Sequence, residues 1–159
     1  MATFKNIPRW IVASVSKHFD ARRDNLPLFI EGQHRDTQDK QNFIELRVDG
    51  PYFTELSKGY WRIYSEINVL VQSAMDDSNF HTIWTNIGIV AAAFTSIPVY
   101  KYGNGPDDDG SLFGCMNLLG DARGKERIQV SYFGKIAPSA ELQQATVEGH
   151  YEMRSTISD

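Results

Sequence analysis

A strand followed by a helix, between Tyr60 and Phe94, constrains the fold of this chain more than any other stretch. From Tyr60 to Val71 apolar and polar side chains alternate, interrupted by Ser65 on the apolar side, and this period of two predicts a strand with one buried face. The residues that follow with helical spacing are Phe80, Ile83, Trp84, Ile87, Val90, Ala91 and Phe94. The intervening residues 76–79 can cap a helix N-terminus. The stretch predicts a helix that covers a sheet, and it indicates no chemistry.

Composition limits what the chain can be. With 159 residues we expect one domain, residues 1–159, large enough to bury a core without disulfides. The net charge of -4 argues against a protein that binds nucleic acid by neutralising phosphates. The single cysteine, Cys115, excludes an internal disulfide and a cysteine-based zinc site, and we expect it half-buried in a strand. No signal peptide or membrane span is predicted, which fits a protein made in a reducing compartment.

The other elements follow from periodicity and turn residues. A first helix is expected to begin after Asn6, with Pro8 in its first turn and an apolar stripe that runs from Ile7 to Phe19. Further strands are predicted at Leu28–Ile30, Phe43–Asp49, Ile97–Tyr102, Leu112–Leu119, Arg127–Phe133 and Leu142–Met153. Gly50-Pro51 is either a turn or a bulge through which the second of these strands continues into residues 52–55, and Lys58-Gly59 returns the chain into the central strand. Pro98 suits an edge strand.

These elements predict an α+β fold with a mostly antiparallel sheet, two helices packed on it and extra C-terminal strands. In the last strand, Ala145, Val147, Tyr151 and Met153 form the apolar face, and the opposite face is polar. The tail 154–159 has little to bury.

A search for reactive groups gives no catalytic, metal or cofactor site. His18, His34, His81 and His150 fall in four different elements, and each is expected at the surface or at its boundary. The sequence contains no nucleophile elbow, phosphate loop or dinucleotide fingerprint. The aspartates 107–109 lack the alternating ligand spacing of a calcium loop, and both these and the pair at 76–77 are expected in solvated turns where pKa tuning is weak.

One alternative is a module that binds single-stranded nucleic acid. Tyr60, Arg62 and Tyr64 lie on the polar face of the central strand, where bases could stack. The net acidity and the absence of a basic stripe argue against it.

The order helix, polar loop, strand pair, helix, strand resembles the tail terminator proteins of long-tailed bacteriophages. The residues that carry the resemblance are residues 9–12 (Arg-Trp-Ile-Val), the strand Tyr60–Val71, the helix within residues 77–94 and the Ile-Pro-Val of residues 97–99. It covers roughly residues 8–102. The three strands that follow exceed the minimal terminator plan, so they are either a decoration or a sign of a related neck, connector or tail-tube protein.

The resemblance implies a virion structural protein, made in the host cytoplasm, that is not an enzyme. Such proteins form a ring, usually hexameric, that joins the tail tube to the head, so the implied partners are other copies of the chain, tail-tube and head–tail connector proteins. DNA would pass through the channel without specific binding, and neither a cofactor nor a membrane is involved. The polar loops 31–42 and 103–110 are candidates to reach neighbouring subunits, through His34, Arg35, Asp36, Asp39, Lys40, Asp107, Asp108 and Asp109.

Overall fold

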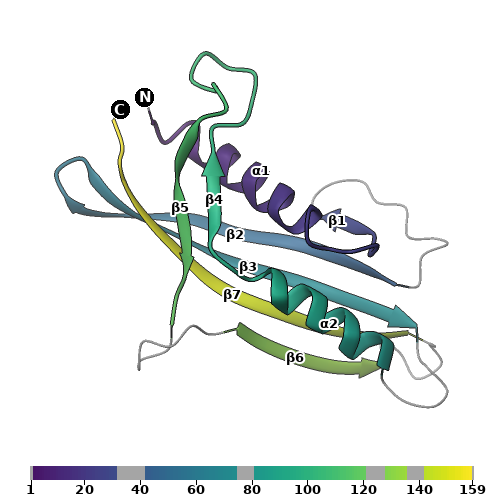
Figure 1. Ribbon diagram of the computed structural model, residues 1–159. Coiled ribbons are helices and arrows are strands. Elements are labelled where there is room, and N and C mark those ends of the chain that lie inside the picture. Colours follow the sequence, from purple (N-terminus) through teal and green to yellow (C-terminus); the bar gives the residue numbers. More distant parts are fainter. Residues whose placement is uncertain (1, 32–41, 75–80, 121–127, 136–141, 159) are drawn as a thin grey trace.

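The computed structural model describes residues 2–31, 42–74, 81–120, 128–135 and 142–158. It has the predicted α+β fold, with two helices and a mostly antiparallel sheet of seven strands (Figure 1). In chain order the elements are α1 (Ile7–Asp20), β1 (Leu28–Ile30), β2 (Phe43–Ser57), β3 (Tyr60–Ala74), α2 (His81–Ala93), β4 (Ile97–Tyr100), β5 (Leu112–Leu118), β6 (Ile128–Lys135) and β7 (Leu142–Thr156). The strand order is β1-β2-β3-β7-β5-β4, and β6 also pairs with β7.

The centre of the sheet is the antiparallel pair β3–β7. Its register is unbroken over fifteen positions, from Tyr60 opposite Thr156 to Ala74 opposite Leu142. The alternation predicted for both strands is confirmed, because their apolar faces are buried together. β7 is therefore a central strand and not a decoration. The expectation that the tail has little to bury is wrong, since β7 continues past Met153 and Ile157 is 5% exposed.

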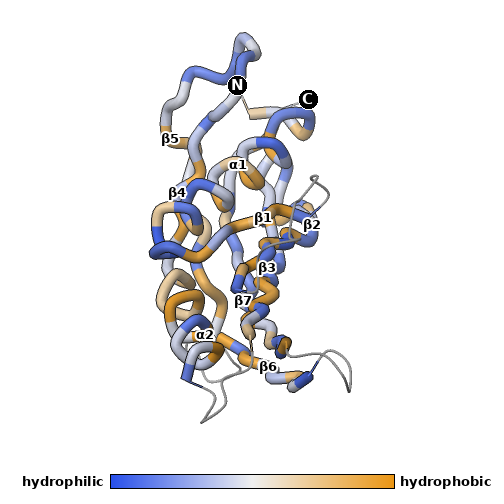
Figure 2. Tube along the Cα trace, turned by 90° about the vertical axis from the view of Figure 1, so that its right-hand side faces the viewer, coloured by the Kyte–Doolittle hydropathy of each residue, from blue (hydrophilic) through white to orange (hydrophobic). Residues whose placement is uncertain are grey.

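Helix α1 lies between two layers of strands. Viewed from the side, β2, β3 and β7 form one layer, β4 and β5 lie opposite them, and α1 lies between (Figure 2). Its predicted apolar stripe is buried, and Trp10 beside it is also fully buried. Pro8 occupies the first turn, as predicted. Asn6 makes no side-chain cap and instead donates from Nδ2 to Oδ2 of Asp107 at 3.3 Å.

Strand β2 continues through Gly50-Pro51, so the bulge alternative is correct and the turn alternative is wrong. The peptide bond between these residues is cis, and the register with β3 shifts between Asp49 and Tyr52. Gly50 has a φ of 102°, and a Cβ there would lie 3.0 Å from the carbonyl oxygen of Tyr64, so this bulge requires glycine. Beyond it, β2 and β3 form a long hairpin that turns at Lys58-Gly59, as predicted, and projects away from the helices (Figure 1).

Helix α2 buries most of its predicted apolar face, including Ile83, Ile87 and Val90. Trp84 was expected on that face, but its side chain is 47% exposed. The buried face instead includes Asn86, whose Nδ2 donates to Oγ of Ser73 on β3 at 3.0 Å. The strand that follows α2, β4, lies at the edge of the sheet, as Pro98 predicted, and ends at Tyr100.

Candidate functional site

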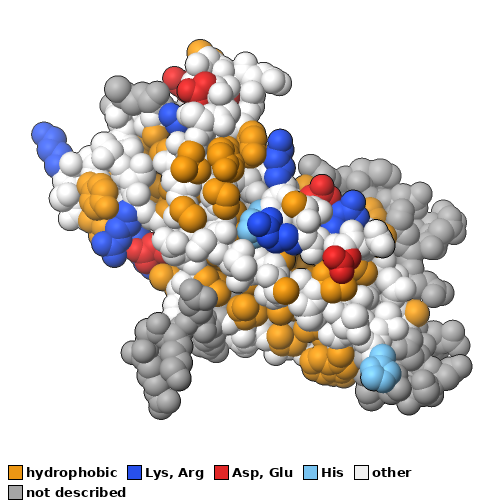
Figure 3. All heavy atoms as spheres, viewed as in Figure 1, with side chains coloured by type: hydrophobic (Ala, Val, Ile, Leu, Met, Phe, Trp, Pro, Cys, Tyr) orange, Lys and Arg blue, Asp and Glu red, His pale blue; other side chains and the backbone are white. Residues whose placement is uncertain are grey.

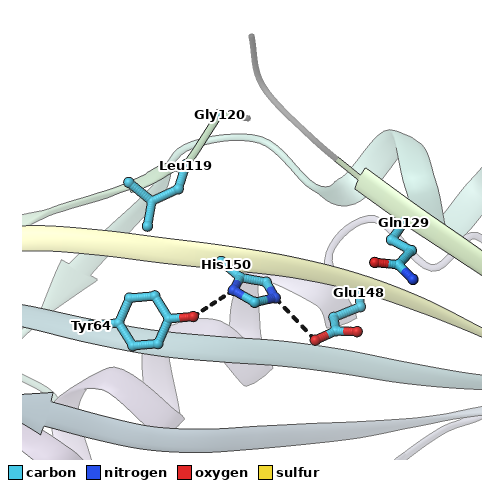
Figure 4. A pocket seen from close by; sticks show the side chains of 6 residues that line it. All are labelled: Tyr64, Leu119, Gly120, Gln129, Glu148 and His150. Carbon is cyan, nitrogen blue, oxygen red and sulfur yellow. Dashed lines mark hydrogen bonds and ion pairs between the residues drawn. The ribbon is translucent and has the colours of Figure 1, made fainter. Parts of the chain in front are cut away.

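A pocket of about 400 Å³ opens on the polar face of the sheet, where β7 changes its neighbour. β5 pairs with β7 at Tyr151 and Glu152, whereas β6 pairs with it from Gly149 toward the start of the strand. His150 lies between these two pairings. The pocket is lined by Tyr64 from β3, Glu148 and His150 from β7, Gln129 from β6, and Leu119 and Gly120 after β5 (Figure 4).

Four side chains of this face form one hydrogen-bonded chain. The imidazole of His150 contacts the Tyr64 hydroxyl through Nδ1 and Oε1 of Glu148 through Nε2, the latter at 3.0 Å (Figure 4). The Tyr64 hydroxyl also lies 2.9 Å from Oε1 of Glu66, and that carboxylate is 3.9 Å from Nδ1 of His150. The imidazole is therefore held between two acidic side chains and a phenol.

The Tyr64 hydroxyl remains protonated at neutral pH. Burial, together with the hydrogen bond to Glu66 and the charge of that carboxylate, raises the pKa of Tyr64 to about 12. The phenol can therefore donate a proton in a hydrogen bond but cannot serve as a phenolate nucleophile. Among the described residues that line the pocket, none is a serine, threonine or cysteine that could supply a hydroxyl or thiol nucleophile. The described side chains Tyr64, Glu148 and His150 can donate, accept and hold protons.

A second charged group continues the same face toward the hairpin. Glu152 accepts from Nε of Arg62 and Nε of Arg154, each at 3.0 Å. Burial alone would raise the pKa of Glu152, but the hydrogen bonds and charges of the two arginines outweigh it, and the pKa is lowered. The Arg62 guanidinium also lies 5.1 Å from the centre of the Tyr64 ring. The Tyr64 ring, on which nucleic-acid bases could stack, is therefore already in contact with charged side chains.

No group of histidine, cysteine and acidic side chains that could hold a metal occurs among the described residues. The acidic loop 103–110, whose aspartates were considered as calcium ligands, instead makes hydrogen bonds to α1. Asp108 accepts from Nη2 of Arg9 and from Nε1 of Trp10, both at 2.5 Å, and its side chain is 1% exposed. The hydrogen bonds from Arg9 and Trp10 lower its pKa to about 2. The expectation of weak pKa tuning in this loop is therefore wrong for Asp108.

The predicted contact residues have different surroundings. His34, Arg35, Asp36, Asp39 and Lys40 lie outside the described residues, as do the acidic pair 76–77 and the predicted cap. Asp107 and Asp109 are exposed, and Asp109 accepts from the backbone and the hydroxyl of Ser111. These remain candidate contacts, whereas the Asp108 carboxylate is turned inward.

Two further sequence expectations about single side chains are wrong. Cys115 is exposed on β5 and not half-buried. His18 is buried, and its Nε2 lies 2.8 Å from the carbonyl oxygen of Ala93; burial lowers its pKa. His150 was expected at the surface or its boundary, and its part in a pocket was missed. The alternation of β7 placed it on the polar face, but nothing in the sequence showed that Tyr64 lies beside it.

Two apolar surfaces lie outside the core. The first, which we call the β6 strip, lies beside α2 on the core side of the sheet (Figure 3). Trp84 of α2 packs on Tyr132 of β6 with ring centroids 5.5 Å apart. The members of the β6 strip and their exposed fractions are Trp84 (47%), Ile128 (37%), Val130 (40%) and Tyr132 (38%). In the part of the chain that the structure describes, the outer edge of β6 has no strand partner.

The second surface, which we call the hairpin tip, lies on the β2–β3 hairpin. Its members are Tyr52 (56% exposed), Leu56 (45%) and Tyr60 (40%). Tyr60 pairs with Thr156 of β7, whereas Val130 of the β6 strip pairs with Val147. At ~3.3 Å per residue, Tyr60 and Val130 are roughly 30 Å apart along β7.

Comparisons with known proteins identify a fold and no family. No family model and no curated protein matches the chain. One solved structure, of a protein whose name describes no function, aligns over 98% of this chain and 97% of its own length, with a TM-score of 0.58 and 10% sequence identity. At this identity the likeness concerns the fold alone. None of the described helices is long and apolar enough to cross a membrane.

Proposed function

We propose that this chain is a structural subunit that associates with copies of itself into a closed ring, in which one surface of each subunit contacts a different surface of the next. The bacteriophage tail terminator and neck-ring proteins, which its sequence resembles, form such rings. On this proposal it acts in the virion, between tail tube and head–tail connector, and it is not an enzyme. A tail-tube or connector role is the alternative within the same class. The resemblance rests on element order, so the physical argument must come from the surfaces of the chain.

The observation that carries the proposal is the pair of separated apolar surfaces. An interface between identical surfaces, as in a two-fold dimer, needs one self-complementary patch. Head-to-tail association needs two different patches on each subunit, and it gives a ring when the rotation between subunits closes. The β6 strip offers a strand edge and a tryptophan, and the hairpin tip offers apolar side chains on an arm that projects from the sheet. Docking of the tip of one copy on the strip of the next would cover both surfaces.

The charges on the polar face support this proposal over a module that binds single-stranded nucleic acid. Tyr64, which was a candidate platform for bases, lies beside Glu66 and Glu148, and both carboxylates would repel phosphates. The binding module predicts an affinity for single-stranded DNA that falls steeply with salt. Absence of such binding at low salt would exclude it.

The ring can be tested with two variants that each disable one surface. Val130→Lys places a charge on the β6 strip, and Leu56→Glu does so on the hairpin tip; both positions are exposed, so the fold should tolerate the changes. By light scattering after size exclusion and negative-stain imaging, the wild type should form closed rings and each variant should be monomeric. Leu112→Glu is the matched control, because Leu112 is 59% exposed but belongs to neither surface.

Mixing the two variants gives the sharpest outcome. Each retains one intact surface, so a head-to-tail interface allows them to form a dimer and nothing larger. Variants that still form rings would contradict the proposal. A wild type that stays monomeric at high concentration would favour the module that binds single-stranded nucleic acid, and titration with single-stranded DNA would then be the next experiment.

A further inference from the structure

We infer that neighbouring subunits of the proposed ring are joined by backbone hydrogen bonds, in which the outer edge of β6 in one copy pairs with the outer edge of the β2–β3 hairpin in the next. This pairing rests on the proposed function and gives the chemistry by which its two surfaces recognise each other. The two edges lie on opposite sides of one sheet, whose strands follow in the order β2, β3, β7 and β6 (Figure 1). Copies joined in this way share a continuous sheet.

The direction of the backbone groups on β6 follows from a hydrogen bond at its neighbour β7. The amide of Leu119, after β5, donates to the carbonyl oxygen of His150 at 2.7 Å, so the backbone groups of His150 point away from β3. Because these directions alternate along a strand, the backbone groups of Glu148 point to β6 and those of Val147 point to β3. Val130, which lies opposite Val147, therefore turns its N–H and C=O outward, away from β7.

The outer edge of β6 combines open backbone groups with apolar side chains. By the same alternation the backbone groups of Ile128 and Val130 point outward, and their side chains belong to the β6 strip. In the part of the chain that the structure describes, no strand lies beside this edge. The stretch Ile128–Tyr132 contains neither a charged residue nor a proline, the usual protections of a strand edge. A strand added here would satisfy the backbone groups and cover the side chains.

The outer edge of β2 follows the same rule. The alternation counted from His150 through β3 places the backbone groups of Leu46 outward, and on that side its carbonyl oxygen accepts from the amide of Glu31 at 2.9 Å. This second hydrogen bond is independent of the first and agrees with it. Among the described strands, β1 alone lies on this side of β2, and it pairs with Ile44–Leu46.

Beyond the bulge at residues 50–51, the outer edge of the hairpin is formed by Phe53 and Glu55. They lie opposite Ile63 and Trp61 of β3, whose backbone groups point to β7, so the backbone groups of Phe53 and Glu55 point outward. The ring of Phe4 packs on that of Phe53 with centroids 4.9 Å apart, which holds this part of the hairpin in place. The hairpin therefore presents a second, fixed strand edge.

The charges of the two edges favour pairing of β6 with the hairpin of another copy over pairing of like edges. Lys135 is the charged residue of β6, and Glu55 is the charged residue of the hairpin strand Tyr52–Ser57; both are exposed. Opposite edges bring opposite charges into one interface, whereas two copies of the same edge bring together charges of one sign. Pairing of unlike edges also continues from subunit to subunit, as a ring requires, whereas pairing of like edges ends at a dimer.

The first test removes one outward amide and keeps the intramolecular ladder. Val130→Pro deletes an N–H that points away from β7, and an edge strand tolerates proline at such a position. Val130→Thr is the matched control, because it keeps the amide and the β-branched shape. By circular dichroism both variants should be folded. By light scattering we expect Val130→Pro to be monomeric and Val130→Thr to assemble like the wild type. Assembly of the proline variant, or a monomeric threonine variant, would overturn the inference.

The hairpin edge is tested with Glu55→Pro, which deletes the outward amide on that side. Glu55→Gln is its control, because it keeps the amide and an oxygen that can accept from the backbone N–H of Gly59, 3.1 Å from Oε1 of Glu55. Glu55→Pro alone should be monomeric, and its mixture with Val130→Pro should give a dimer and nothing larger. Rings formed by Glu55→Pro would show that the hairpin edge does not cover β6 and would overturn the assigned partner.

Hydrogen exchange followed by nuclear magnetic resonance tests the pairing without any substitution in β6. In the wild type at high concentration the amide of Val130 should exchange slowly, whereas in Leu56→Glu it should exchange rapidly. The amide of Ser131, which points to β7, should exchange slowly in both. Rapid exchange of Val130 in the wild type would overturn strand pairing whether or not rings form. Slow exchange in a dimer or an open chain would support strand pairing and contradict the closed ring, so the two proposals fail separately.

Discussion

The indole Nε1 of Trp10 donates a hydrogen bond to Oδ1 of Asp108 at 2.5 Å, although 98 residues separate them in the chain. Asp108 also accepts from Arg9 and from the backbone of Gly105, so one carboxylate fastens the acidic loop to the start of α1. The buried indole has few other ways to satisfy its N–H, which makes this contact a structural one.

We expect Asp108→Asn to lower the melting temperature at neutral pH, because the charged hydrogen bonds to Arg9 and Trp10 are weakened. The folded pKa of about 2 lies below the ordinary value of 3.8. Because this carboxyl has a lower pKa in the folded than in the unfolded protein, its ionisation stabilises the folded state at pH values above the ordinary pKa. This stabilisation is lost as the pH falls toward 2. Thermal melts should therefore show a large difference in melting temperature between wild type and variant at pH 7, and this difference should become smaller below about pH 3. A difference in melting temperature that is the same at both pH values would contradict the prediction.

Ser65 is a buried polar residue whose removal should not destabilise the fold. Its hydroxyl is fully buried on the core face of β3 and has no hydrogen-bond partner among the described residues. Replacing it by alanine deletes an unsatisfied group with little change of volume, so Ser65→Ala should stabilise the protein by about 1 kcal/mol. Urea unfolding measures this change.

Ser73 is the matched control on the same strand. It is equally buried, but it accepts the hydrogen bond of Asn86. Ser73→Ala leaves that buried donor unsatisfied and should destabilise by about 1–3 kcal/mol. Equal effects of the two substitutions would show that the hydroxyl environments do not differ.

Gly149 allows the core to approach β7 closely. A Cβ at this position would lie 2.6 Å from Cδ1 of Phe94 and 3.0 Å from Cδ1 of Leu118. Gly149→Ala should therefore cost about 1–3 kcal/mol, as overpacking typically does. Gly88→Ala, within α2 and with open space around it, should instead stabilise by about 1 kcal/mol. Chemical denaturation distinguishes the two, and a neutral Gly149→Ala would contradict the close packing.

Tyr151 has a fully buried ring, and its hydroxyl donates a hydrogen bond to the carbonyl oxygen of Thr95 at 2.9 Å. Tyr151→Phe keeps the ring and removes this bond, so we expect a loss of about 1 kcal/mol. Hydrogen exchange should show the loss of protection around Thr95, where α2 leads into β4. Unchanged unfolding and exchange would indicate that the bond adds nothing to stability.

The local elements were predictable because each has its own periodicity. The alternation of β3 and β7 and the helical stripe of α1 identified their buried faces correctly. Trp84 was misplaced because it falls on the margin of the helical stripe, where spacing alone cannot tell a buried position from an exposed one. The helical spacing also did not identify Asn86 as buried, although its Nδ2 donates a hydrogen bond to Oγ of Ser73 in the core.

Features that depend on pairing between distant segments were not predictable. The pocket exists because β7 lies beside β3 and has both β5 and β6 on its other side. No pattern within Leu142–Thr156 shows which strand it joins. For the same reason, Asp108 could be recognised as part of a turn but not as the partner of Trp10.

The position of β7 also governs how this protein must be made. β3 leaves the ribosome early, but the neighbour that covers its second edge is synthesised only after α2, β4, β5 and β6. Until then the nascent chain displays an open apolar strand, a state that favours aggregation and chaperone binding. Completion of the fold is thus deferred until translation has passed the final strand, and a ribosome that stalls before Leu142 releases a chain whose sheet cannot form its centre.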